Sequence, residues 1–469
     1  MENKSKNTIR HIAELISQNK NLEEENIRLQ QQLEEAIFER DKYKSLVNRY
    51  KLESKDRAGV KGKEANILRF KMATVLFADA EGFADISEEM DSGQLVDNLD
   101  EIFLELGNII NKHELKSQKS IGDSLLSVGG IPHKNITNPI QVVLAAVEIQ
   151  YYLNIIQKTY GDDRIWRLRI GVHTGPVVAH ISGRKKINYD IKGDTVNLAT
   201  RIRSYCEQGN ILISESTYEL VKDLFQCEYF TRMPVKYKGD MLLYYVKGIR
   251  PEYSLQKKTI IPNKAFSIRF GLIQFTDLQE LMLNKMEKEL PPNLFYHNIK
   301  HTIDVVTQVE LIGLGEGVAD DQLLLLKTAA LFHDAGHILG YDDHERFSTL
   351  IAREILPDYY YTQTQIEQIC ELIFATQMPP KPRNKLEEIM CDADLDYLGR
   401  SDMIPVSTML YRELKEIDKV KSWNEWNRLQ IKFISNHQYY TKTALSLREV
   451  NKQKQIERIR KLLETGSEE

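Results

Sequence analysis

The sequence predicts a multidomain protein with an N-terminal coiled coil, a central α+β domain and an all-α C-terminal domain. Apolar residues recur every seven positions in residues 1–57, residues 66–250 contain strand-like apolar runs, a hairpin and helices, and residues 278–463 are helical in pattern. Residues 251–277 are expected to be a linker. A chain of 469 residues with 42% hydrophobic residues is too long for one core and can bury two or three.

The N-terminal segment carries a heptad pattern. One seam position is occupied by Leu15, Leu22, Leu29, Ala36, Tyr43 and Tyr50. The companion position is occupied by Ile12, Asn19, Asn26, Leu33 and Val47. A polar asparagine in a seam specifies an in-register two-stranded pair, so we expect a parallel homodimer. The alternative is a single solvated helix or a disordered arm, because Arg40 and the aromatic positions weaken the seam.

Two carboxylates in the central domain follow strand-like segments. Asp79 ends the apolar run 73–78, and Asp123 lies in the turn of the hairpin 116–128. A strand and a hairpin that each deliver a carboxylate can hold two hard cations such as Mg²⁺ or Mn²⁺. Gly82, with Phe83 beside it, allows backbone N–H groups to approach phosphate oxygens. Taken singly, either aspartate is more simply explained as a solvated acid at a strand end or a turn residue.

A third segment adds an amide and a guanidinium. Asn197 and Arg201 are four residues apart after a loop that contains Gly193, so we expect them on adjacent turns of one helix. Arg201 can stabilise charge that develops on phosphates, and Asn197 can orient a ribose. An isolated pair of this kind would more often be a solvated helix face.

Together the three segments resemble the class III nucleotidyl cyclases, from about Leu68 to Ile249. The resemblance implies a ferredoxin-like βαββαβ core and a homodimer, formed through the coiled coil and the cyclase domains, whose two active sites each use both subunits and two Mg²⁺ or Mn²⁺ ions. The residues implied to bind these ions are Asp79, Ala80 and Asp123. The implied transition-state residues are Asn197 and Arg201. The implied substrate-binding residues are Lys119 and Asp190 for the purine, and Gly82, Phe83, Lys236 and Lys238 for the phosphates, with Lys238 preferred over Lys236.

The substrate is argued from Lys119 and Asp190. Adenine presents an acceptor at its ring N1 and a donor at its exocyclic amine, which an ammonium and a carboxylate complement, whereas guanine reverses both polarities. We therefore expect ATP as substrate and cyclic AMP as product. A guanylate cyclase and a non-catalytic nucleotide-binding regulator stay open as alternatives.

The C-terminal domain carries metal-ligand residue types. His297 and His301 are four residues apart and are expected on one helical face, and His333-Asp334 ends another apolar helix. Asp392 and Asp394 follow later. A single histidine on an apolar helix is usually a core residue, but the ordered set of His, His-Asp and Asp is a stronger signal.

That order resembles the HD superfamily of metal-dependent phosphohydrolases, and the run 296–301 is similar to one in animal-type cyclic-nucleotide phosphodiesterases. The resemblance implies that His301, His333, Asp334 and either Asp392 or Asp394, with Asp394 favoured, bind a divalent metal. His297 would protonate the leaving oxygen of a phosphoester. Gly336 departs from the phosphodiesterase pattern, which has an acidic residue there. Hydrolysis of a cyclic nucleotide as the main output, or a domain that only regulates the cyclase, stay open.

Bulk properties exclude several classes of protein. The net charge of −5 gives no reason to expect nucleic acid as a partner. Four cysteines without metal or disulfide spacing and an N-terminus without an apolar signal region fit a reducing cytoplasm. The longest apolar stretches, 142–153 and 323–332, are interrupted by Glu148 and Lys327 and are expected to be too short to span a membrane.

Overall fold

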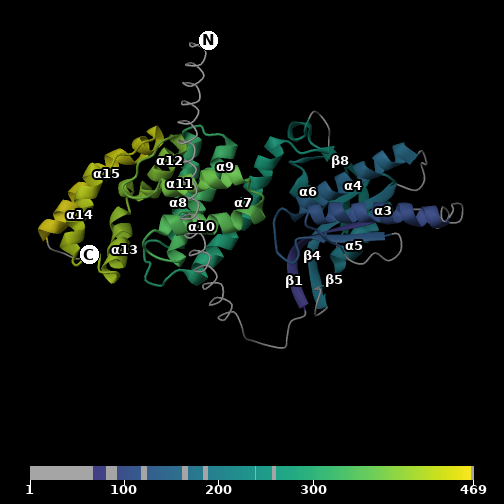
Figure 1. Cartoon of the computed structure of the whole chain (residues 1–469), viewed down its shortest axis with the longest axis horizontal. Helices are drawn as coiled ribbons and strands as arrows, with labels where there is room; N and C mark the ends of the chain where they lie inside the picture. Colours follow the sequence, from purple (N-terminus) through teal and green to yellow (C-terminus); the bar gives the residue numbers. More distant parts are fainter. Residues whose placement is uncertain are drawn as a thin grey trace, which may run out of the picture. The chain divides into compact units, whose positions relative to one another are not determined.

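The computed structural model describes most of the residues that follow position 66 (Figure 1). The described residues are 67–80, 92–117, 124–160, 167–182, 188–237, 239–255 and 260–465. The predicted coiled coil lies outside them, as do five predicted site residues, Gly82, Phe83, Lys119, Asp123 and Lys238. The described residues belong to one unit, Ile67–Glu469.

Eight strands in the described part of the protein form one mixed sheet. They are β1 (Ile67–Ala80), β2 (Lys116–Ser117), β3 (Ser124–Gly129), β4 (Leu168–Ser182), β5 (Asn188–Lys192), β6 (Ile211–Ser214), β7 (Phe225–Val235) and β8 (Gly239–Ile249). Their order is β2-β3-β1-β4-β6-β8-β7, with β5 paired to β4. The β4–β6 pair is parallel, and the other pairs are antiparallel.

Helices cover both faces of this sheet. They are α3 (Ser92–Lys112), α4 (Asn138–Tyr160), α5 (Asp194–Tyr205) and α6 (Glu215–Val221). Leu76 and Ala78 of β1 share a buried cluster with α3 and α4, whereas Ala73 and Val75 share one with Ala199 of α5. Because side chains alternate along a strand, Asp79 lies on the α5 face.

The apolar run 142–153 is part of α4, which has 23 residues. The expectation that this segment is too short to span a membrane was therefore wrong, because the helix extends beyond the run. By length and composition alone, Asn138–Lys158 is a candidate membrane span. The buried core helix of a soluble protein passes the same test. In the fold, 61% of the apolar window of Asn138–Lys158 is buried, with Val142, Val143 and Ile149 completely inaccessible.

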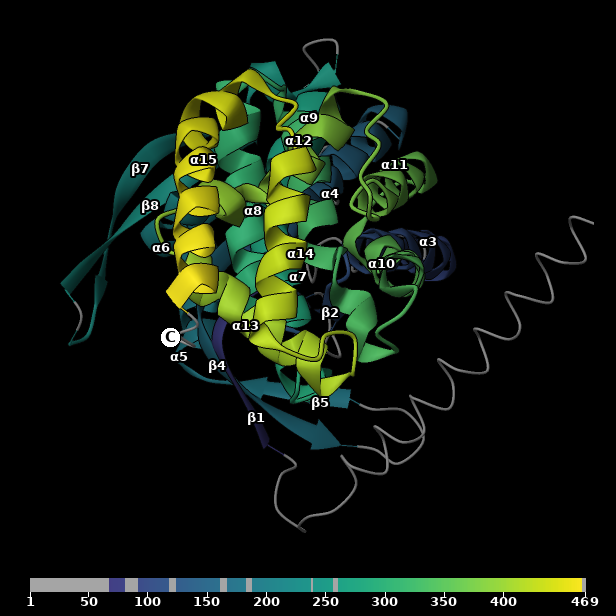
Figure 2. The ribbon, with the colours of Figure 1, turned by 90° about the vertical axis from the view of Figure 1, so that its left-hand side faces the viewer.

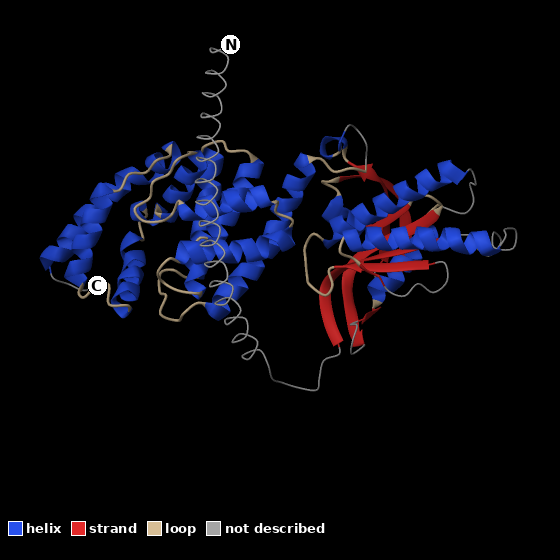
Figure 3. Ribbon diagram, in the orientation of Figure 1, coloured by secondary structure: helices blue, strands red, loops and turns tan. Residues whose placement is uncertain are grey.

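The C-terminal part consists of helices, as Figure 3 shows. They are η1 (Pro251–Tyr253), α7 (Lys264–Glu289), α8 (Ile299–Gly315), α9 (Asp320–Phe332), η3 (Ala335–Ile338), α10 (His344–Ile355), η4 (Leu356–Tyr359), α11 (Gln363–Phe374), α12 (Lys385–Asp394), η5 (Asp396–Gly399), α13 (Met403–Glu416), α14 (Trp423–Asn436) and α15 (Lys442–Thr465). Figure 2 faces α13, α14 and α15. The second apolar run, 323–332, belongs to α9.

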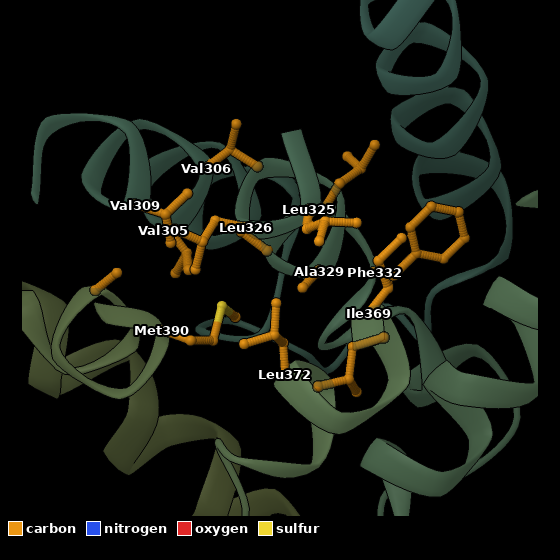
Figure 4. Packing of buried hydrophobic residues seen from close by; sticks show 14 of the residues in the cluster. Val305, Val306, Val309, Leu325, Leu326, Ala329, Phe332, Ile369, Leu372 and Met390 are labelled. Carbon is orange, nitrogen blue, oxygen red and sulfur yellow. The ribbon is translucent and has the colours of Figure 1, made fainter. Parts of the chain in front are cut away.

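The core of the helical part is built around α9 (Figure 4). Leu326, Ala329 and Phe332 of α9 are completely buried against neighbours such as Val309 of α8 and Met390 of α12. Lys327 is tolerated in this helix because its ammonium pairs with Glu310 at 2.8 Å. Burial of the whole apolar run stabilises the helices that carry the histidines.

The expected linker 251–277 is only partly a connector, because α7 begins at Lys264. The side chain of Asn263 caps this helix by accepting a hydrogen bond from the backbone N–H of Phe266. Phe266 belongs to the same buried cluster as α3 and α4, and Phe275 and Leu278 belong to the cluster of α9. Residues 264–277 of the expected linker are therefore helical and contribute apolar side chains to both cores.

Gly171 of β4 lies directly under α5. A Cβ atom at this position would come within 2.5 Å of the Ala199 carbonyl oxygen and would also collide with the Arg203 backbone nitrogen. Both obstacles are backbone atoms, so only a shift of the helix could relieve the clash. We therefore expect Gly171→Ala to lower the free energy of unfolding by about 2–3 kcal/mol in urea denaturation of the full-length protein followed by circular dichroism.

Gly107 provides the matched control, since it lies within α3 and a Cβ there would meet nothing within 4 Å. Gly107→Ala should be neutral or should stabilise the protein by about 0.5–1 kcal/mol because alanine favours a helix. Equal stability of the two variants would contradict the tight packing of α5 on β4.

Candidate active sites

The carboxylate of Asp79, near the end of β1, contacts two arginines. Arg169 stands opposite it on β4, with Nε 3.3 Å from Oδ1 and Nη2 3.2 Å from Oδ2. Arg203 of α5 brings its Nη1 to 2.7 Å from Oδ2. The three side chains are 14%, 16% and 17% exposed, respectively. Asp79 is thus held in a partly buried cluster with a net positive charge.

Asn197 and Arg201 lie on α5, as expected, and both are exposed. Arg201 donates a hydrogen bond from Nη2 to the Pro234 carbonyl oxygen at 2.8 Å. At roughly 100° per residue, Arg203 lies about 200° around the helix from Arg201, and therefore on the opposite face. Within one copy of the protein, α5 turns Arg203 toward Asp79 while Asn197 and Arg201 face elsewhere.

The other predicted nucleotide-site and metal-site residues that are described are Asp190, Lys236 and Ala80, of which Ala80 directly follows Asp79. Asp190 of β5 is exposed and pairs with Lys192 at 3.0 Å. Lys236 is exposed in the turn after β7, with its ammonium 5.0 Å from the centroid of the Tyr237 ring. Ala80 is the last residue of β1.

A second cluster gathers the histidines and aspartates of the helical part. His301 lies in the first turn of α8, His333 and Asp334 follow α9, and Asp394 is the last residue of α12. The His301 Nε2 lies 3.3 Å from Asp334 Oδ2 and 3.2 Å from Asp394 Oδ1. The His333 Nε2 lies 3.2 Å and 3.5 Å from the same two oxygens. The side chains of these four residues, from three helix ends, thus lie within contact distance of one another.

The carboxylates of this cluster favour the protonated, positively charged form of its two histidines. Burial by itself lowers the pKa of His301, but the carboxylates of Asp334 and Asp394 raise that pKa to about 8. Burial is likewise outweighed at His333, whose pKa the two carboxylates raise well above its usual value. Burial disfavours ionised aspartates, yet the histidines hold the pKa of Asp334 and of Asp394 below the usual range. A bound cation could replace the protons that balance these carboxylates.

Sequence reasoning missed two histidines beside Asp334. His337 Nε2 lies 4.0 Å and His344 Nε2 lies 3.6 Å from Asp334 Oδ1. Both ring nitrogens of His337 are buried without a hydrogen-bond partner, and burial lowers its pKa to about 2. A neutral imidazole with free nitrogens is the form that binds metals. His297, Asp334 and His337 are close enough together to hold a second ion.

The signal for His337 was present in the run 333–337, where it follows the His-Asp pair by three positions. The family resemblance pointed instead to Gly336, where an acidic residue was expected. A Cβ at Gly336 would collide with the carbonyl oxygen of His344 and lie 2.6 Å from the Ser348 nitrogen. The close approach of α10 excludes any side chain at 336 and brings His344 to Asp334.

His297 is not on the helix of His301, contrary to the expectation of a shared helical face. Asn298 is the N-cap of α8, so His297 precedes the helix. Its Nδ1 is hydrogen-bonded to the carboxylate of Glu413. The other oxygen of Glu413 accepts hydrogen bonds from the backbone N–H groups of Tyr296 at 2.9 Å and His297 at 3.1 Å. Glu413, which is completely buried and was also missed, thus fixes the orientation of the imidazole.

Asp392 has a different environment from Asp394. Its carboxylate accepts hydrogen bonds from the backbone N–H groups of Tyr440 at 2.9 Å and Thr441 at 2.7 Å, just before α15. Asp392 therefore ties the start of α15 to α12. The geometry places Asp394, and not Asp392, beside His301 and His333.

A cavity of about 780 Å³ opens over the histidine cluster. Its polar end is formed by His297, Asp334, His344 and Asp394. Its remaining wall includes Leu410 and Leu414 of α13 and Trp426, Leu429 and Phe433 of α14. A cavity with a few charged groups at one end and an apolar wall can hold a ligand with an ionic and an apolar part.

Comparison with known proteins gives one family match in the strand-containing part of the chain and one in the helical part. The family model of the adenylate and guanylate cyclase catalytic domain matches residues 65–248, and that of the HD domain matches residues 298–397. An adenylate cyclase of Mycobacterium tuberculosis is 31% identical over 40% of this chain and 43% of its own length. The receptor-type guanylate cyclase gcy-8 of Caenorhabditis elegans is 31% identical over 39% of this chain and 16% of its own length. The match thus spans less than half of either relative.

Solved structures of cyclases match a similar share of the chain. The adenylyl cyclase CyaB of P. aeruginosa is 28% identical over 39% of this chain and 97% of its own length, with a TM-score of 0.37. The guanylate cyclase domain of RhGC from Catenaria anguillulae, solved with GTP, is 30% identical over 39% of this chain and 100% of its own length, with a TM-score of 0.36. From the family matches, the protein contains an adenylate and guanylate cyclase catalytic domain followed by an HD domain.

Proposed function

We propose that the protein is an adenylate cyclase that converts ATP to 3′,5′-cyclic AMP and pyrophosphate at sites shared between two copies of itself. The cyclase family match supports the reaction class, and relatives of both nucleotide specificities leave the base to be argued from residues. The observation that carries the proposal is that the two faces of α5 differ: one face contacts Asp79, and the opposite face carries Asn197 and Arg201.

Asp79 and Asp123, with Ala80 beside them, would hold two Mg²⁺ or Mn²⁺ ions. A carboxylate at the end of a strand is a suitable hard oxygen donor. The ions would supply neutralisation of the triphosphate charge. Asn197 would orient the ribose so that its 3′ oxygen faces the α-phosphorus, and Arg201 would stabilise the charge that develops there.

The remaining substrate contacts follow from charge. Gly82 and Phe83 would offer backbone N–H groups to the phosphates, and Lys236 and Lys238 would bind the terminal phosphates. The exposed position of Lys236 leaves its ammonium accessible. Lys119 and Asp190 would hydrogen-bond to the adenine. The carboxylate of Asp190 is exposed and therefore accessible to the adenine of a nucleotide whose phosphates are bound by a second copy.

This geometry supports the proposal of a homodimer. Arg201 and Arg203 extend from opposite faces of α5, so a nucleotide that contacts Asp79 of one copy cannot also contact Arg201 of the same copy without crossing the helix. A second copy related by twofold symmetry would supply Asn197 and Arg201, and the same contact would create a second site.

For the HD domain we propose hydrolysis of a phosphoester such as a cyclic nucleotide. His301, His333, Asp334 and Asp394 would hold one divalent ion, and Asp334 with His337 would hold another, which leaves the neighbouring His297 to face the substrate. The donors fit such ions, because both nitrogens of His337 are buried without a hydrogen-bond partner and Asp334 Oδ2 faces the ring nitrogens of His301 and His333. The ions would supply an activated water.

His297 would donate a proton to the leaving oxygen. Its Nδ1 is occupied by Glu413, so its Nε2 is the nitrogen that can face the substrate. The burial of Glu413 strengthens this hydrogen bond, and its two contacts to backbone N–H groups hold the carboxylate in place. The apolar wall of the cavity would bind the organic part of the ester.

Complementation tests the shared site. Asp79→Asn and Arg201→Ala variants should each be inactive, but their co-expression should restore about one quarter of wild-type cyclase activity, because half of randomly formed dimers are mixed and each has one intact site. Cyclic AMP formation from ATP is the measurement. Co-expression of Asp79→Asn with Asp123→Asn is the control and should restore nothing. An inactive mixture of the first pair would contradict a site built from two copies.

Nucleotide choice can be tested with Lys119→Glu. The purified protein with Mg²⁺ or Mn²⁺ should form cyclic AMP from ATP in preference to cyclic GMP from GTP, and the variant should lose at least about tenfold of that preference, because glutamate cannot donate to adenine N1. Cyclic GMP as the main product of the unchanged protein would favour the guanylate cyclase alternative, and consumption of added cyclic AMP would support hydrolysis by the HD domain.

Metal content separates the two aspartates of α12. Asp394→Asn should lose divalent metal from the HD domain, measured by plasma mass spectrometry, because it removes a charged ligand. Asp392→Asn should keep the metal but lose about 1–3 kcal/mol of stability, because the buried N–H group of Thr441 and the partly buried one of Tyr440 then share a single amide oxygen as acceptor. Metal loss in Asp392→Asn, with full retention in Asp394→Asn, would reverse the assignment.

A further inference from the structure

One carboxylate, that of Asp79, is bound by two guanidinium groups from different elements. Arg169 reaches it from the neighbouring strand and Arg203 from α5. Two positive charges therefore flank the one negative charge of Asp79 in this partly buried cluster. A cation that approaches Asp79 therefore meets repulsion as well as attraction.

The two arginines are not equally well held. Arg169 contacts both oxygens of Asp79 through two nitrogens, a geometry set by the direct pairing of the two residues across β1 and β4. Arg203 contacts one oxygen through one nitrogen, and its guanidinium carbon lies 5.2 Å from the centroid of the Phe77 ring. Its Nε is buried without a hydrogen-bond partner. Arg203 therefore loses one hydrogen bond when it leaves Asp79, whereas Arg169 would lose two.

The short contact also occupies the place where a metal would bind. Arg203 Nη1 lies 2.7 Å from Asp79 Oδ2, and Mg²⁺ would have to approach a carboxylate oxygen to about 2.0–2.1 Å. A guanidinium and a hard cation cannot both take that side of one oxygen. Displacement of Arg203 leaves the backbone of β1 and β4 unchanged, because only a side chain has to rotate.

We propose that Arg203 is a resident counter-ion that competes with the divalent cation for Asp79 and so raises the metal concentration that the cyclase site requires. This inference rests on the proposed role of Asp79 as a metal ligand. Arg203 is in this sense a positioning residue: it keeps the Asp79 carboxylate ordered and neutralised until a metal ion displaces it.

The test is a titration of the full-length protein with Mn²⁺ alone, with free Mn²⁺ measured by electron paramagnetic resonance. The Mn²⁺ ions whose binding is lost in Asp79→Asn define the Asp79 site, and those that persist in that variant belong elsewhere and serve as an internal check of folding. Arg203→Gln should bind Mn²⁺ at the Asp79 site at least about tenfold more tightly than the unchanged protein, because a nearby positive charge is removed.

Two further variants control for charge and for packing. Arg203→Lys keeps a positive charge and should retain the weaker affinity of the unchanged protein. Arg250→Gln removes the same charge from an arginine whose contacts are with Lys222 and Glu252, and should leave Mn²⁺ affinity at the Asp79 site unaltered.

The outcomes distinguish this inference from the function on which it rests. Unchanged or weaker Mn²⁺ binding in Arg203→Gln, with loss of the site in Asp79→Asn, would overturn the competition and leave the cyclase proposal intact. Wild-type Mn²⁺ binding in Asp79→Asn would remove the metal role of Asp79 itself. Tighter binding in Arg250→Gln, equal to that in Arg203→Gln, would show a general charge effect and would also overturn the competition.

Discussion

The close packing of α5 against β4 is the constraint that positions the candidate site residues of the cyclase region. Gly171 allows the helix backbone to approach the strand so closely that no side chain fits between them. That approach holds Arg203 against Asp79 and, through the 3.6-residue turn of the helix, directs Asn197 and Arg201 away from it. The same contact therefore orders Asp79 and Arg203 on one face of α5 and leaves Asn197 and Arg201 on the other, which is the arrangement on which the proposed dimer rests.

The helical part solves a different problem, which is to gather charged side chains where water is largely excluded. Its ligand-type residues lie at or next to helix ends: His301 lies in the first turn of α8, His333 and Asp334 follow α9, and Asp394 ends α12. The apolar packing around α9 fixes the relative positions of these ends. Mutual attraction of carboxylates and imidazoles then offsets the cost of burying them, and leaves a cluster suited to a cation.

Local motifs were predictable where the chemistry depends on neighbours in the sequence. His333-Asp334 and the pair Asn197 and Arg201 could be singled out because they lie within one or two turns of a helix. Arg169, which binds Asp79, is 90 positions from it, and Glu413 is 116 positions from His297. No local pattern connects such partners. The helix α7 within the expected linker was not predicted for a related reason, since the two cores that it contacts are formed by residues distant from it.

The sequence by itself determined the three-part organisation into heptad, α+β and helical regions as an expectation, and the residue types and spacing that identify the cyclase and HD segments, because apolar periodicity and short motifs are local properties of a polypeptide. Only the tertiary structure decided which of Asp392 and Asp394 lies beside His301, that His337, His344 and Glu413 join the cluster, and that Asp79 is held by two arginines. Those relations depend on which helix and strand ends meet, and packing of the whole fold, not any single segment, sets where they meet.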